Sequence, residues 1–344
     1  MTFNANKLAR PELLTLTPYQ SARRIGGQGD IWINANESPY NNSELDGLNR
    51  YPECQPPALI AAYSRYSQVK QSRIVTCRGA DEAIELLIRT FCEPGKDTIA
   101  TFGPTYGMYA ISAGTFNIGV NEIQLTDDYQ LPHGWQDKAQ AAKLVFICNP
   151  NNPTGSIIDK SQLAAAVASM PETLVVIDEA YIEFSPQYTS TDLLERYPNV
   201  VILRTLSKAF ALAGARCGFL LANEAVIDLV MRVIAPYPVP LPVAQVATNA
   251  LSQSNIALMQ QQVSELNVQG QKLTTALTAI GATSVTPFGN FVLAHFSDVA
   301  AVQTKLAKNG IVARAYKDTR LANAIRFSFT NAAQTQTLIT ALSS

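Results

Sequence analysis

Histidine is nearly absent from this chain, and cysteine occurs without the spacing that metal sites or disulfide frameworks use. The 344 residues contain two histidines, His133 and His295, too far apart to form a ligand pair on one helix. The five cysteines show no C-x-x-C spacing, and their odd number argues against a closed set of disulfides. We therefore expect neither a metal site nor a disulfide-stabilised fold.

Long apolar runs and an excess of charge of one sign are missing too. No stretch of 18 apolar residues occurs, and the first residues lack the apolar core of a signal peptide. The formal net charge is −1 and the isoelectric point is near 6.2, so nothing attracts the chain to nucleic acid or to an anionic membrane. These features favour a soluble cytoplasmic protein. Charged residues make up only 15% of the chain, which either a large buried interface or a large core would explain.

The length and punctuation of the chain predict two lobes. One hydrophobic core rarely serves 344 residues. From about residue 55 to 235, strand-like apolar runs alternate with helical stretches, which is the pattern of a doubly wound α/β sheet. A proline-rich segment, 236–242, follows as a natural boundary. We predict a large domain over 41–240, a small α/β domain over 241–344, and an irregular segment over 1–40 that packs with the small domain.

The second lobe shows one long helix and three short strands. Apolar residues recur at spacings of four and three from Met259 to Ile280, so we expect an amphipathic helix whose apolar stripe packs against the large lobe. Strand-like runs follow at 290–294, 311–314 and 324–329. We expect the N-terminal segment to join these strands.

One lysine follows a buried strand in a setting that suits covalent catalysis. Lys208 comes shortly after the apolar run 200–203; Thr205 and Ser207 precede it, and Arg216 follows. Burial disfavours the ammonium form and lowers the pKa of a lysine, which is what condensation with a carbonyl needs. Taken alone, the position also fits an ordinary surface lysine beyond a strand end.

Two earlier apolar runs end in residues that would complete such a site. The run 174–177 ends at Asp178, with Tyr181 three residues later, and the run 144–148 stops in a Pro/Asn/Gly turn that contains Asn152. Open α/β sheets bind ligands beyond the carboxyl ends of their strands. The three strand ends would therefore deliver an amide, a carboxylate with a phenol, and an amine to one edge of the sheet. An aldehyde cofactor with a basic ring nitrogen, a phenolic oxygen and a phosphate would use all of them.

In these residues the chain resembles the fold-type I, class II aminotransferases that depend on pyridoxal 5'-phosphate (PLP), and within them the histidinol-phosphate aminotransferase family. The resemblance implies a large domain with a mostly parallel seven-stranded sheet flanked by helices, and a smaller α/β C-terminal domain. It covers nearly the whole chain and rests on motifs whose order and spacing are specific: Leu16-Thr-Pro-Tyr-Gln-Ser-Ala, Asn34-Ala-Asn-Glu, Leu48-Asn-Arg-Tyr-Pro, Arg78-Gly-Ala-Asp-Glu, Pro104-Thr-Tyr-Gly-Met-Tyr, Asn149-Pro-Asn-Asn-Pro-Thr-Gly, Asp178-Glu-Ala-Tyr and Ser207-Lys-Ala-Phe.

The resemblance assigns each part of PLP to a group of residues. Asp178 would keep the ring nitrogen protonated so that the ring can accept electrons, although a strand-end helix cap would also explain it. Tyr106 would stack on the ring, or belong to an aromatic core cluster. Asn152 and Tyr181 would bond the phenolic oxygen, and Lys208 would carry the cofactor. The start of a helix and nearby polar groups would hold the phosphate: Ala80, Asp81, Thr205, Ser207 and Arg216.

The resemblance also implies substrate groups and a second subunit. Tyr51 would reach the cofactor phosphate of the neighbouring subunit, so the active unit would be a homodimer with shared sites. Arg314 and Arg326 would hold the substrate's anionic end, and either could instead be a solvated charge at a strand end. Tyr19 and Asn36 would close over the substrate. The residues after both arginines depart from the family pattern, Ala-Tyr after the first and Phe-Ser-Phe-Thr-Asn after the second, which bears on substrate fit.

The implied activity is the transfer of an amino group between L-histidinol phosphate and 2-oxoglutarate, giving imidazole acetol phosphate and L-glutamate in histidine biosynthesis. Threonine-phosphate decarboxylases and aromatic amino acid aminotransferases of the same fold would use the same lysine, aspartate and arginines. A non-catalytic regulator with a PLP-type fold is a further alternative. Such regulators carry a basic winged helix before the PLP domain, and residues 1–40 show no such pattern.

Overall fold

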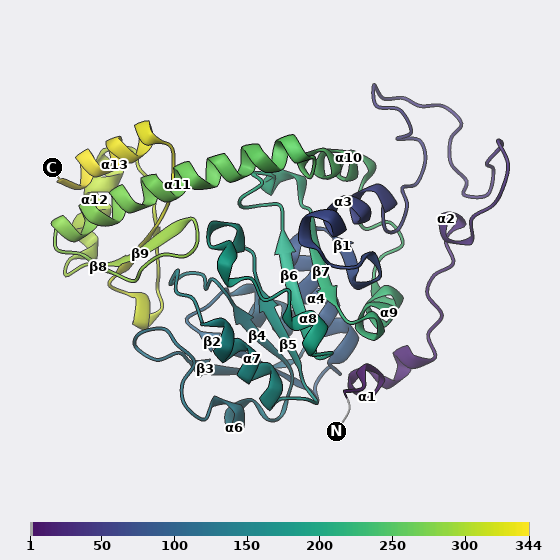
Figure 1. Ribbon diagram of the computed structural model, residues 1–344, viewed down its shortest axis with the longest axis horizontal. Helices are drawn as coiled ribbons and strands as arrows, with labels where there is room; N and C mark the ends of the chain where they lie inside the picture. Colours follow the sequence, from purple (N-terminus) through teal and green to yellow (C-terminus); the bar gives the residue numbers. More distant parts are fainter. Residues whose placement is uncertain (1–2, 344) are drawn as a thin grey trace.

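Two sheets and one long helix organise the chain. The computed structural model describes residues 3–343. A large sheet lies at the centre of the molecule, a small sheet lies near the C-terminus, and helix α11 (Gln253–Ala279) runs from the one to the other (Figure 1). Among residues 3–343, no helix is long and apolar enough to cross a membrane.

The large sheet has seven strands and is mostly parallel, as expected. Its order is β1-β7-β6-β5-β4-β2-β3. The neighbours from β3 to β6 pair in parallel, and β7 runs antiparallel to both β6 and β1. The strands are β1 (Ile74–Cys77), β2 (Thr98–Gly103), β3 (Gly119–Gln124), β4 (Ala142–Cys148), β5 (Leu174–Asp178), β6 (Val200–Thr205) and β7 (Gly218–Ala222).

Helices cover both faces of this sheet, so its central strands are apolar on both sides. In β4, Val145 and Ile147 enter one core, while Leu144 and Phe146 enter the other. The first core includes side chains of α3 (Pro57–Ser67), α6 (Trp135–Ala139), α7 (Lys160–Ser169), α8 (Leu193–Arg196) and α10 (Leu241–Ala250). The second includes side chains of α1 (Ala5–Leu8), α4 (Gly79–Phe91), α5 (Met108–Thr115) and α9 (Glu224–Val233).

Between residues 3 and 240, the remaining short elements are one α-helix and five 3₁₀ turns. They are α2 (Ala22–Ile25), η1 (Pro11–Leu14), η2 (Gln71–Arg73), η3 (Ile182–Phe184), η4 (Pro186–Tyr188) and η5 (Ala213–Ala215).

The small sheet has four antiparallel strands in the order β10-β11-β9-β8. The strands expected at 290–294 and 324–329 correspond to β9 and β11, whereas the one expected at 311–314 is reduced to the two residues of β10. The fourth is β8, directly after α11, and not the N-terminal segment. The elements are β8 (Thr283–Ser284), β9 (Phe291–His295), β10 (Arg314–Ala315) and β11 (Ala324–Ser328), with α12 (Val299–Lys308), η6 (Thr319–Leu321) and α13 (Ala332–Ser343).

Helix α11 belongs to both lobes. Ser252 begins it, since its hydroxyl accepts a hydrogen bond from the amide of Asn255 at 3.4 Å. Met259 and Val263 join the core of the large lobe, whereas Leu273 and Leu277 join the core of the small one. The expectation that the whole stripe packs against the large lobe is therefore correct only for its first half. A single rigid helix thus connects the two cores.

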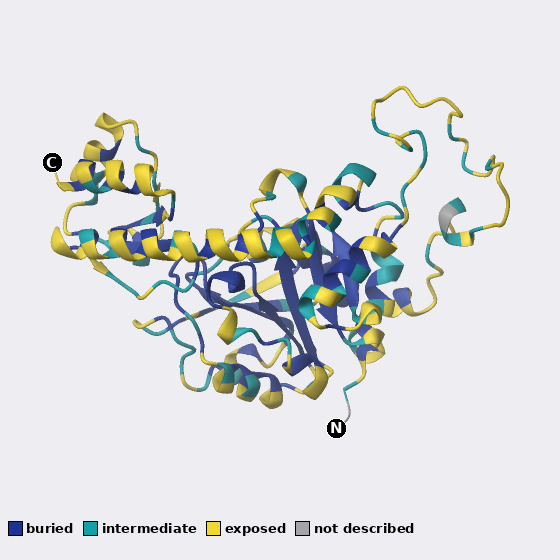
Figure 2. Cartoon of the chain, turned by 45° about the horizontal axis from the view of Figure 1, so that its top comes forward, coloured by how far each residue is buried: buried dark blue, intermediate teal, exposed yellow. Residues whose placement is uncertain are grey.

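The N-terminal segment lies on the large lobe and not on the small one. The amide of Arg10 donates to the carbonyl of Thr90 in α4, and the guanidinium of Arg232 in α9 donates to the carbonyls of Leu13 and Leu14. Residues 15–50 then run as a mostly exposed loop at the opposite end of the molecule from the small sheet (Figures 1 and 2). Within one chain, the described part of this segment, residues 3–40, makes these contacts with the large lobe and not the expected ones with the small sheet.

The stripe residue Gly270 marks a close approach between α11 and the small domain. A Cβ at this position would lie 2.3 Å from a ring atom of Phe329. We predict that Gly270→Ala lowers the free energy of unfolding by about 1–3 kcal/mol, because the ring must leave its packed position.

The matched control is Gly114→Ala in α5, where a Cβ would meet nothing within 4 Å. That variant should be neutral or more stable, because alanine favours a helix over glycine. Urea unfolding of the two variants checks the pair. Equal stabilities would contradict the close approach.

Candidate active site

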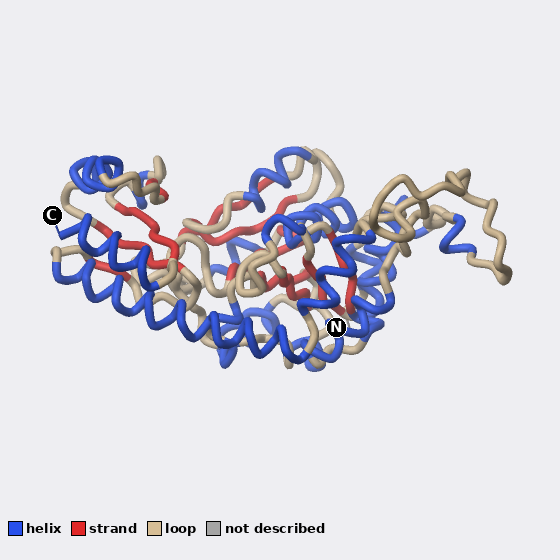
Figure 3. Tube along the Cα trace, turned by 90° about the horizontal axis from the view of Figure 1, so that it is seen from above, coloured by secondary structure: helices blue, strands red, loops and turns tan. Residues whose placement is uncertain are grey.

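A cavity of about 600 Å³ opens at the carboxyl ends of β4, β5 and β6. Both lobes contribute to its walls, since residues of β10 and β11 face the ends of the large-sheet strands. The tube view shows the small sheet beside this end of the large one (Figure 3). Twelve of the residues singled out in the sequence line the cavity: Ala80, Asp81, Tyr106, Asn152, Asp178, Tyr181, Thr205, Ser207, Lys208, Arg216, Arg314 and Arg326.

A buried carboxyl group lies at the base of the cavity. Asp178 is the last residue of β5 and is only 2% exposed. The hydroxyl of Tyr109 donates a hydrogen bond to its Oδ2 at 2.6 Å, and the amide of Ala180 donates to its Oδ1 at 3.1 Å. Burial nevertheless raises the pKa of Asp178 to about 6. The site therefore holds a carboxylate whose ionised form would gain from a cation in the cavity.

Lys208 faces the same cavity with a pKa below its ordinary value. Burial is the larger cause, and the nearby guanidinium of Arg326 lowers the pKa of Lys208 further. Its Nζ lies 5.4 Å from the centre of the Tyr181 ring. A larger share of this amine is therefore uncharged near neutral pH than in an ordinary lysine.

Three polar groups connect the two lobes inside the cavity. Nδ2 of Asn152 donates to the hydroxyl of Tyr181 at 3.3 Å, and Oδ1 of Asn152 accepts from Nη1 of Arg326 at 2.5 Å. Burial raises the pKa of Tyr181 above its usual value, so its phenol keeps the proton and can donate a hydrogen bond. Asn152 thus links a phenol of the large lobe to a guanidinium of the small lobe.

The start of α4 forms a cradle for an anion. Gly79 has a φ of +83°, and a Cβ there would lie 2.9 Å from Nη2 of Arg216. Glycine thus lets the guanidinium lie over the first amides of the helix, where its positive end favours an anion. At the same place Nη2 of Arg216 pairs with Oδ2 of Asp81 at 3.0 Å, and the hydroxyl of Tyr106 donates to Oδ1 of Asp81 at 3.0 Å.

Two hydroxyls of the β6 end complete this cradle. The hydroxyl of Thr205 donates to Oγ of Ser207 at 2.9 Å, and Nη1 of Arg216 donates to the same Oγ at 3.4 Å. Backbone amides, hydroxyls and a guanidinium therefore converge on one small region of the cavity wall.

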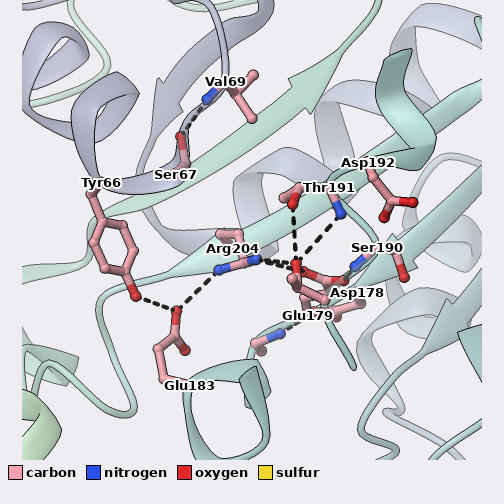
Figure 4. Close-up of polar contacts among 12 residues, drawn as sticks. Tyr66, Ser67, Val69, Asp178, Glu179, Glu183, Ser190, Thr191, Asp192 and Arg204 are labelled. Atoms are coloured by element: carbon pink, nitrogen blue, oxygen red, sulfur yellow. Dashed lines mark hydrogen bonds and ion pairs between the residues drawn. The ribbon is translucent and has the colours of Figure 1, made fainter. Parts of the chain in front are cut away.

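A buried ion-pair network links the ends of β5 and β6 (Figure 4). Arg204 in β6 pairs with Glu179 at 2.7 Å and with Glu183 at 3.2 Å, and its Nη2 donates to Oγ1 of Thr189 at 2.9 Å. The side chains of Arg204, Glu179 and Glu183 are all less than 10% exposed. Removal of one partner from such a buried pair typically costs about 3–5 kcal/mol. Because Glu179 follows Asp178, the network holds the ends of β5 and β6 in register.

The two expected substrate arginines lie on neighbouring strands of the small sheet. Arg314 in β10 and Arg326 in β11 are directly paired in the ladder. The guanidinium of Arg326 lies 5.2 Å from the centre of the Phe291 ring. Two guanidinium groups therefore reach one cavity from one edge of the small domain, which suits a dianion better than one would.

Three residues that the resemblance assigns to the site do not line this cavity. Tyr19 is 68% exposed on the N-terminal loop. Asn36 and Tyr51 line a separate depression together with the segment 240–242. A single copy of the chain does not bring these three residues to the cavity.

Tyr109 and the Arg204 network were not among the site residues expected from the sequence. Tyr109 stands in the same Pro104-Thr-Tyr-Gly-Met-Tyr motif as Tyr106, three residues further on, and it lies in α5, whereas Tyr106 precedes that helix. Arg204 was visible as a charge that ends the apolar run of β6. In both cases the signal existed, but the partner could not be named without the fold.

The cavity fits PLP on its own chemistry. A buried carboxylate with a raised pKa suits a protonated ring nitrogen, and a phenol with an amide suits the phenolic oxygen. An anion cradle at a helix start suits the phosphate, and an amine with a lowered pKa suits the aldehyde. By contrast, among residues 3–343 no group of three or more His, Cys, Asp or Glu side chains is arranged to hold a metal ion.

The fold and this site define a transaminase of the PLP-dependent kind. The sequence model of the family described as Aminotransferase class I and II matches residues 28–342. The chain belongs to that family and is an enzyme.

Within the family, the similar curated proteins define a narrower group. A histidinol-phosphate aminotransferase of Shewanella oneidensis is 65% identical over 97% of this chain and 88% of its own length. One of Shewanella amazonensis is 56% identical over 98% of this chain and 95% of its own length. The chain therefore belongs to the histidinol-phosphate aminotransferase family.

A solved structure has the same fold. The histidinol-phosphate aminotransferase of Sinorhizobium meliloti, in complex with pyridoxal-5'-phosphate, matches with a TM-score of 0.78 at 22% identity. The match covers 85% of this chain and 82% of that chain.

The raised pKa of Asp178 has a consequence for stability that can be measured without the cofactor. Its value of about 6 in the folded protein exceeds the unfolded value of about 3.9. The carboxyl group therefore favours the folded state at low pH, and this contribution is lost as the pH rises through 6. Between roughly pH 4 and pH 7.5, the free energy of unfolding of the wild-type protein should fall by about 3 kcal/mol relative to that of Asp178→Asn.

Urea unfolding of the cofactor-free proteins across this pH range tests the prediction. Asp137→Asn, at an exposed aspartate, is the matched control and should follow the wild type. A pH-independent difference between the wild type and Asp178→Asn would contradict the raised pKa.

Proposed function

We propose that this chain transfers an amino group between L-histidinol phosphate and 2-oxoglutarate, giving imidazole acetol phosphate and L-glutamate, with PLP as its cofactor. The observation that carries the chemistry is the apposition of Lys208 and Asp178 on one cavity, with pKa values shifted in opposite directions. Membership of the histidinol-phosphate aminotransferase family supports the choice of substrate. The reaction belongs to histidine biosynthesis.

Each role that the proposed chemistry requires has a side chain in the cavity. When bound, PLP supplies an aldehyde that condenses with amines and a cationic ring that accepts an electron pair. Asp178 would hold the proton on the ring nitrogen, while Asn152 and Tyr181 would bond the phenolic oxygen. Lys208, uncharged at its Nζ, would hold the cofactor through its aldehyde carbon C4′. Once displaced by the substrate amine, its Nζ would take the proton from the amine-bearing carbon and deliver it to C4′.

The remaining cofactor contacts and the substrate contacts follow from the walls of the cavity. Tyr106 would stack on the ring. We assign the phosphate of the cofactor to the helix start and its neighbours: Ala80, Asp81, Thr205, Ser207 and Arg216. Arg314 and Arg326 would hold the phosphate of histidinol phosphate in one half-reaction and a carboxylate of glutamate in the other. Charge-assisted, bidentate contacts from guanidinium groups suit both anions.

We predict that Lys208→Ala lowers the turnover of L-histidinol phosphate with 2-oxoglutarate by about a thousandfold or more, because the general base and the attacking amine are both lost. An assay of glutamate formation with purified protein measures this. Lys305→Ala, at an exposed lysine of α12, should keep full activity. Turnover that survives in Lys208→Ala would overturn the proposal.

The same assay separates the two enzymes that could share this chemistry. L-phenylalanine in place of histidinol phosphate tests an aromatic aminotransferase, and threonine phosphate with detection of released CO₂ tests a decarboxylase. We expect a preference for histidinol phosphate over both.

We further propose that the active unit is a homodimer in which Tyr51 reaches the partner's site. The loop 15–50 exposes large apolar side chains that a monomer has no reason to expose: Ile25 is 69%, Ile31 is 85% and Ile33 is 88% exposed. The same loop carries Tyr19 and Asn36, which we assign to substrate closure in the assembled enzyme. A second copy covering this loop would bury the apolar groups and bring these residues to a cavity.

Shared sites predict complementation between two defective variants. In a heterodimer of Lys208→Ala and Tyr51→Ala, one site carries both changes and the other carries neither. Random mixing of equal amounts of subunits should therefore restore about a quarter of the wild-type activity. The assay compares the remixed sample with the two parents, and activity no higher than the parents' average would contradict a shared site.

We also propose the domain division 1–40, 41–240 and 241–344 and a cytoplasmic location. The proline-rich segment before Leu241, where α10 begins, supports a boundary there, while the side chains of α10 and of the first half of α11 pack in the core of the large lobe. All five cysteines are free and buried, as is usual in a reducing compartment.

A further inference from the structure

Arg320 lies midway in the sequence between Arg314 and Arg326, and its side chain is hydrogen-bonded to the large lobe. It belongs to η6, in the connection that joins β10, which carries Arg314, to β11, which carries Arg326. Its amide donates to Oδ1 of Asp318 at 2.8 Å, which caps this turn. The turn is therefore ordered locally, and its guanidinium is free to bond elsewhere.

The guanidinium of Arg320 makes three hydrogen bonds, and all of them go to the large lobe. Nη1 donates to the carbonyl of Gly103 at 3.1 Å and to Oε1 of Gln124 at 2.9 Å, and Nη2 donates to the carbonyl of Thr126 at 3.3 Å. Gly103 ends β2 and Gln124 ends β3. The guanidinium also lies 6.0 Å from the centre of the Tyr129 ring. The planar fork of arginine suits this array, and a lysine could not reproduce it.

Other contacts between the lobes lie outside this connection. The amide of Phe288 donates to the carbonyl of Gly155 at 2.9 Å, and the hydroxyl of Tyr129 bonds Nε2 of His295 at 3.2 Å. These contacts hold the linker before β9 and the end of β9. The strand pair β10–β11 carries the two substrate arginines, and its connecting turn is hydrogen-bonded to the large lobe through Arg320. Among the described residues, the other hydrogen bond from this strand pair to the large lobe is that of Arg326 to Asn152 inside the cavity.

We propose that Arg320 is a positioning residue that fixes Arg314 and Arg326 at the correct distance from the amine of Lys208, and so enables the enzyme to use the phosphate of its substrate. This inference rests on the proposed function. The groups assigned to PLP all lie in the large lobe, whereas the groups assigned to the substrate anion lie in the small lobe. The binding energy of the anion helps catalysis only if the two lobes hold a fixed geometry.

The test compares L-histidinol phosphate with L-histidinol, which lacks the phosphate. In the PLP-loaded wild type, kcat/KM should be much higher for the phosphorylated substrate. In Arg320→Ala this preference should fall about tenfold or more, chiefly through KM, because small displacements of a substrate anchor are costly. The dissociation constant of PLP should change less than about twofold, because the bonds of Arg320 do not touch its residues.

A matched control separates positioning from general packing. Arg73 also bonds a carbonyl and a side chain, those of Leu194 and Glu195, but entirely within the large lobe. Arg73→Ala should keep the preference for the phosphorylated substrate. Arg320→Lys keeps the positive charge but lacks the planar guanidinium, and its preference for L-histidinol phosphate should lie between those of Arg320→Ala and the wild type. If Arg320→Ala does not fold, Arg320→Lys serves as the test variant.

The outcomes distinguish this inference from the proposed function. A wild-type protein that does not prefer the phosphorylated substrate would overturn both. A wild-type preference that survives in Arg320→Ala, or in Arg320→Lys where only that variant folds, would overturn the inference about Arg320 alone. Equal losses for L-histidinol and L-histidinol phosphate would also overturn it, because a structural role alone predicts them.

Discussion

The site depends on a carboxylate held out of water beside the cavity. Asp178 receives hydrogen bonds from Tyr109 and from the amide of Ala180, yet its pKa is about 6. Two hydrogen bonds thus do not offset the cost of burying the charge. A cation in the cavity would supply the missing stabilisation, and the ring nitrogen of PLP becomes such a cation when protonated. In the role that we propose for Asp178, the carboxylate and the cofactor would each keep the other in the charge state that catalysis needs.

The scaffold around this carboxylate is built to resist displacement. Asp178 ends a strand in the middle of the sheet, and the next residue, Glu179, belongs to the Arg204 network. The lysine follows the next strand, so β5 and β6 carry the two groups at neighbouring strand ends. A buried arginine between two glutamates is costly to assemble and more costly to break. The network thus gives this end of the sheet a rigidity that hydrophobic packing alone would not specify.

The second constraint is that the two lobes have different roles in the proposed function. The residues that we assign to the cofactor lie on the large lobe, and Arg314 and Arg326, which we assign to the substrate anion, lie on the small lobe. The connection between them is α11, whose first half belongs to one core and whose second half belongs to the other. With these assignments, substrate recognition would depend on lobe geometry, whereas cofactor binding would not.

The sequence predicted the large lobe well for physical reasons that are local. Apolar runs such as 174–177 are readable because a central parallel strand is buried on both faces, and the order of strand ends then predicts which side chains meet. The small sheet was predicted less well: β8 and β10 are two-residue strands, too short to leave a period. The split of the α11 stripe between two cores was not visible either, because one apolar face looks the same whichever core it enters.

The site residues show the same contrast between those that the sequence could place and those that it could not. Residues at strand ends, such as Asp178 and Lys208, could be placed from spacing. Tyr109 could not be paired with Asp178, because its side chain meets the carboxylate only through the packing of α5 on the sheet. Arg320 gave no signal at all, since a charge in a loop is usually solvated. Tyr19, Asn36 and Tyr51 do not line the cavity in one copy of the chain.

The most direct test of this account is the protonation state of the cofactor ring in the loaded enzyme. Nitrogen NMR of the protein reconstituted with PLP labelled with ¹⁵N at the ring nitrogen reports that state as a function of pH. The account predicts that the ring nitrogen stays protonated at about pH 8 in the wild-type protein and loses its proton in Asp178→Asn. A wild-type ring nitrogen that is deprotonated at that pH would contradict the pairing with Asp178 on which the mechanism rests.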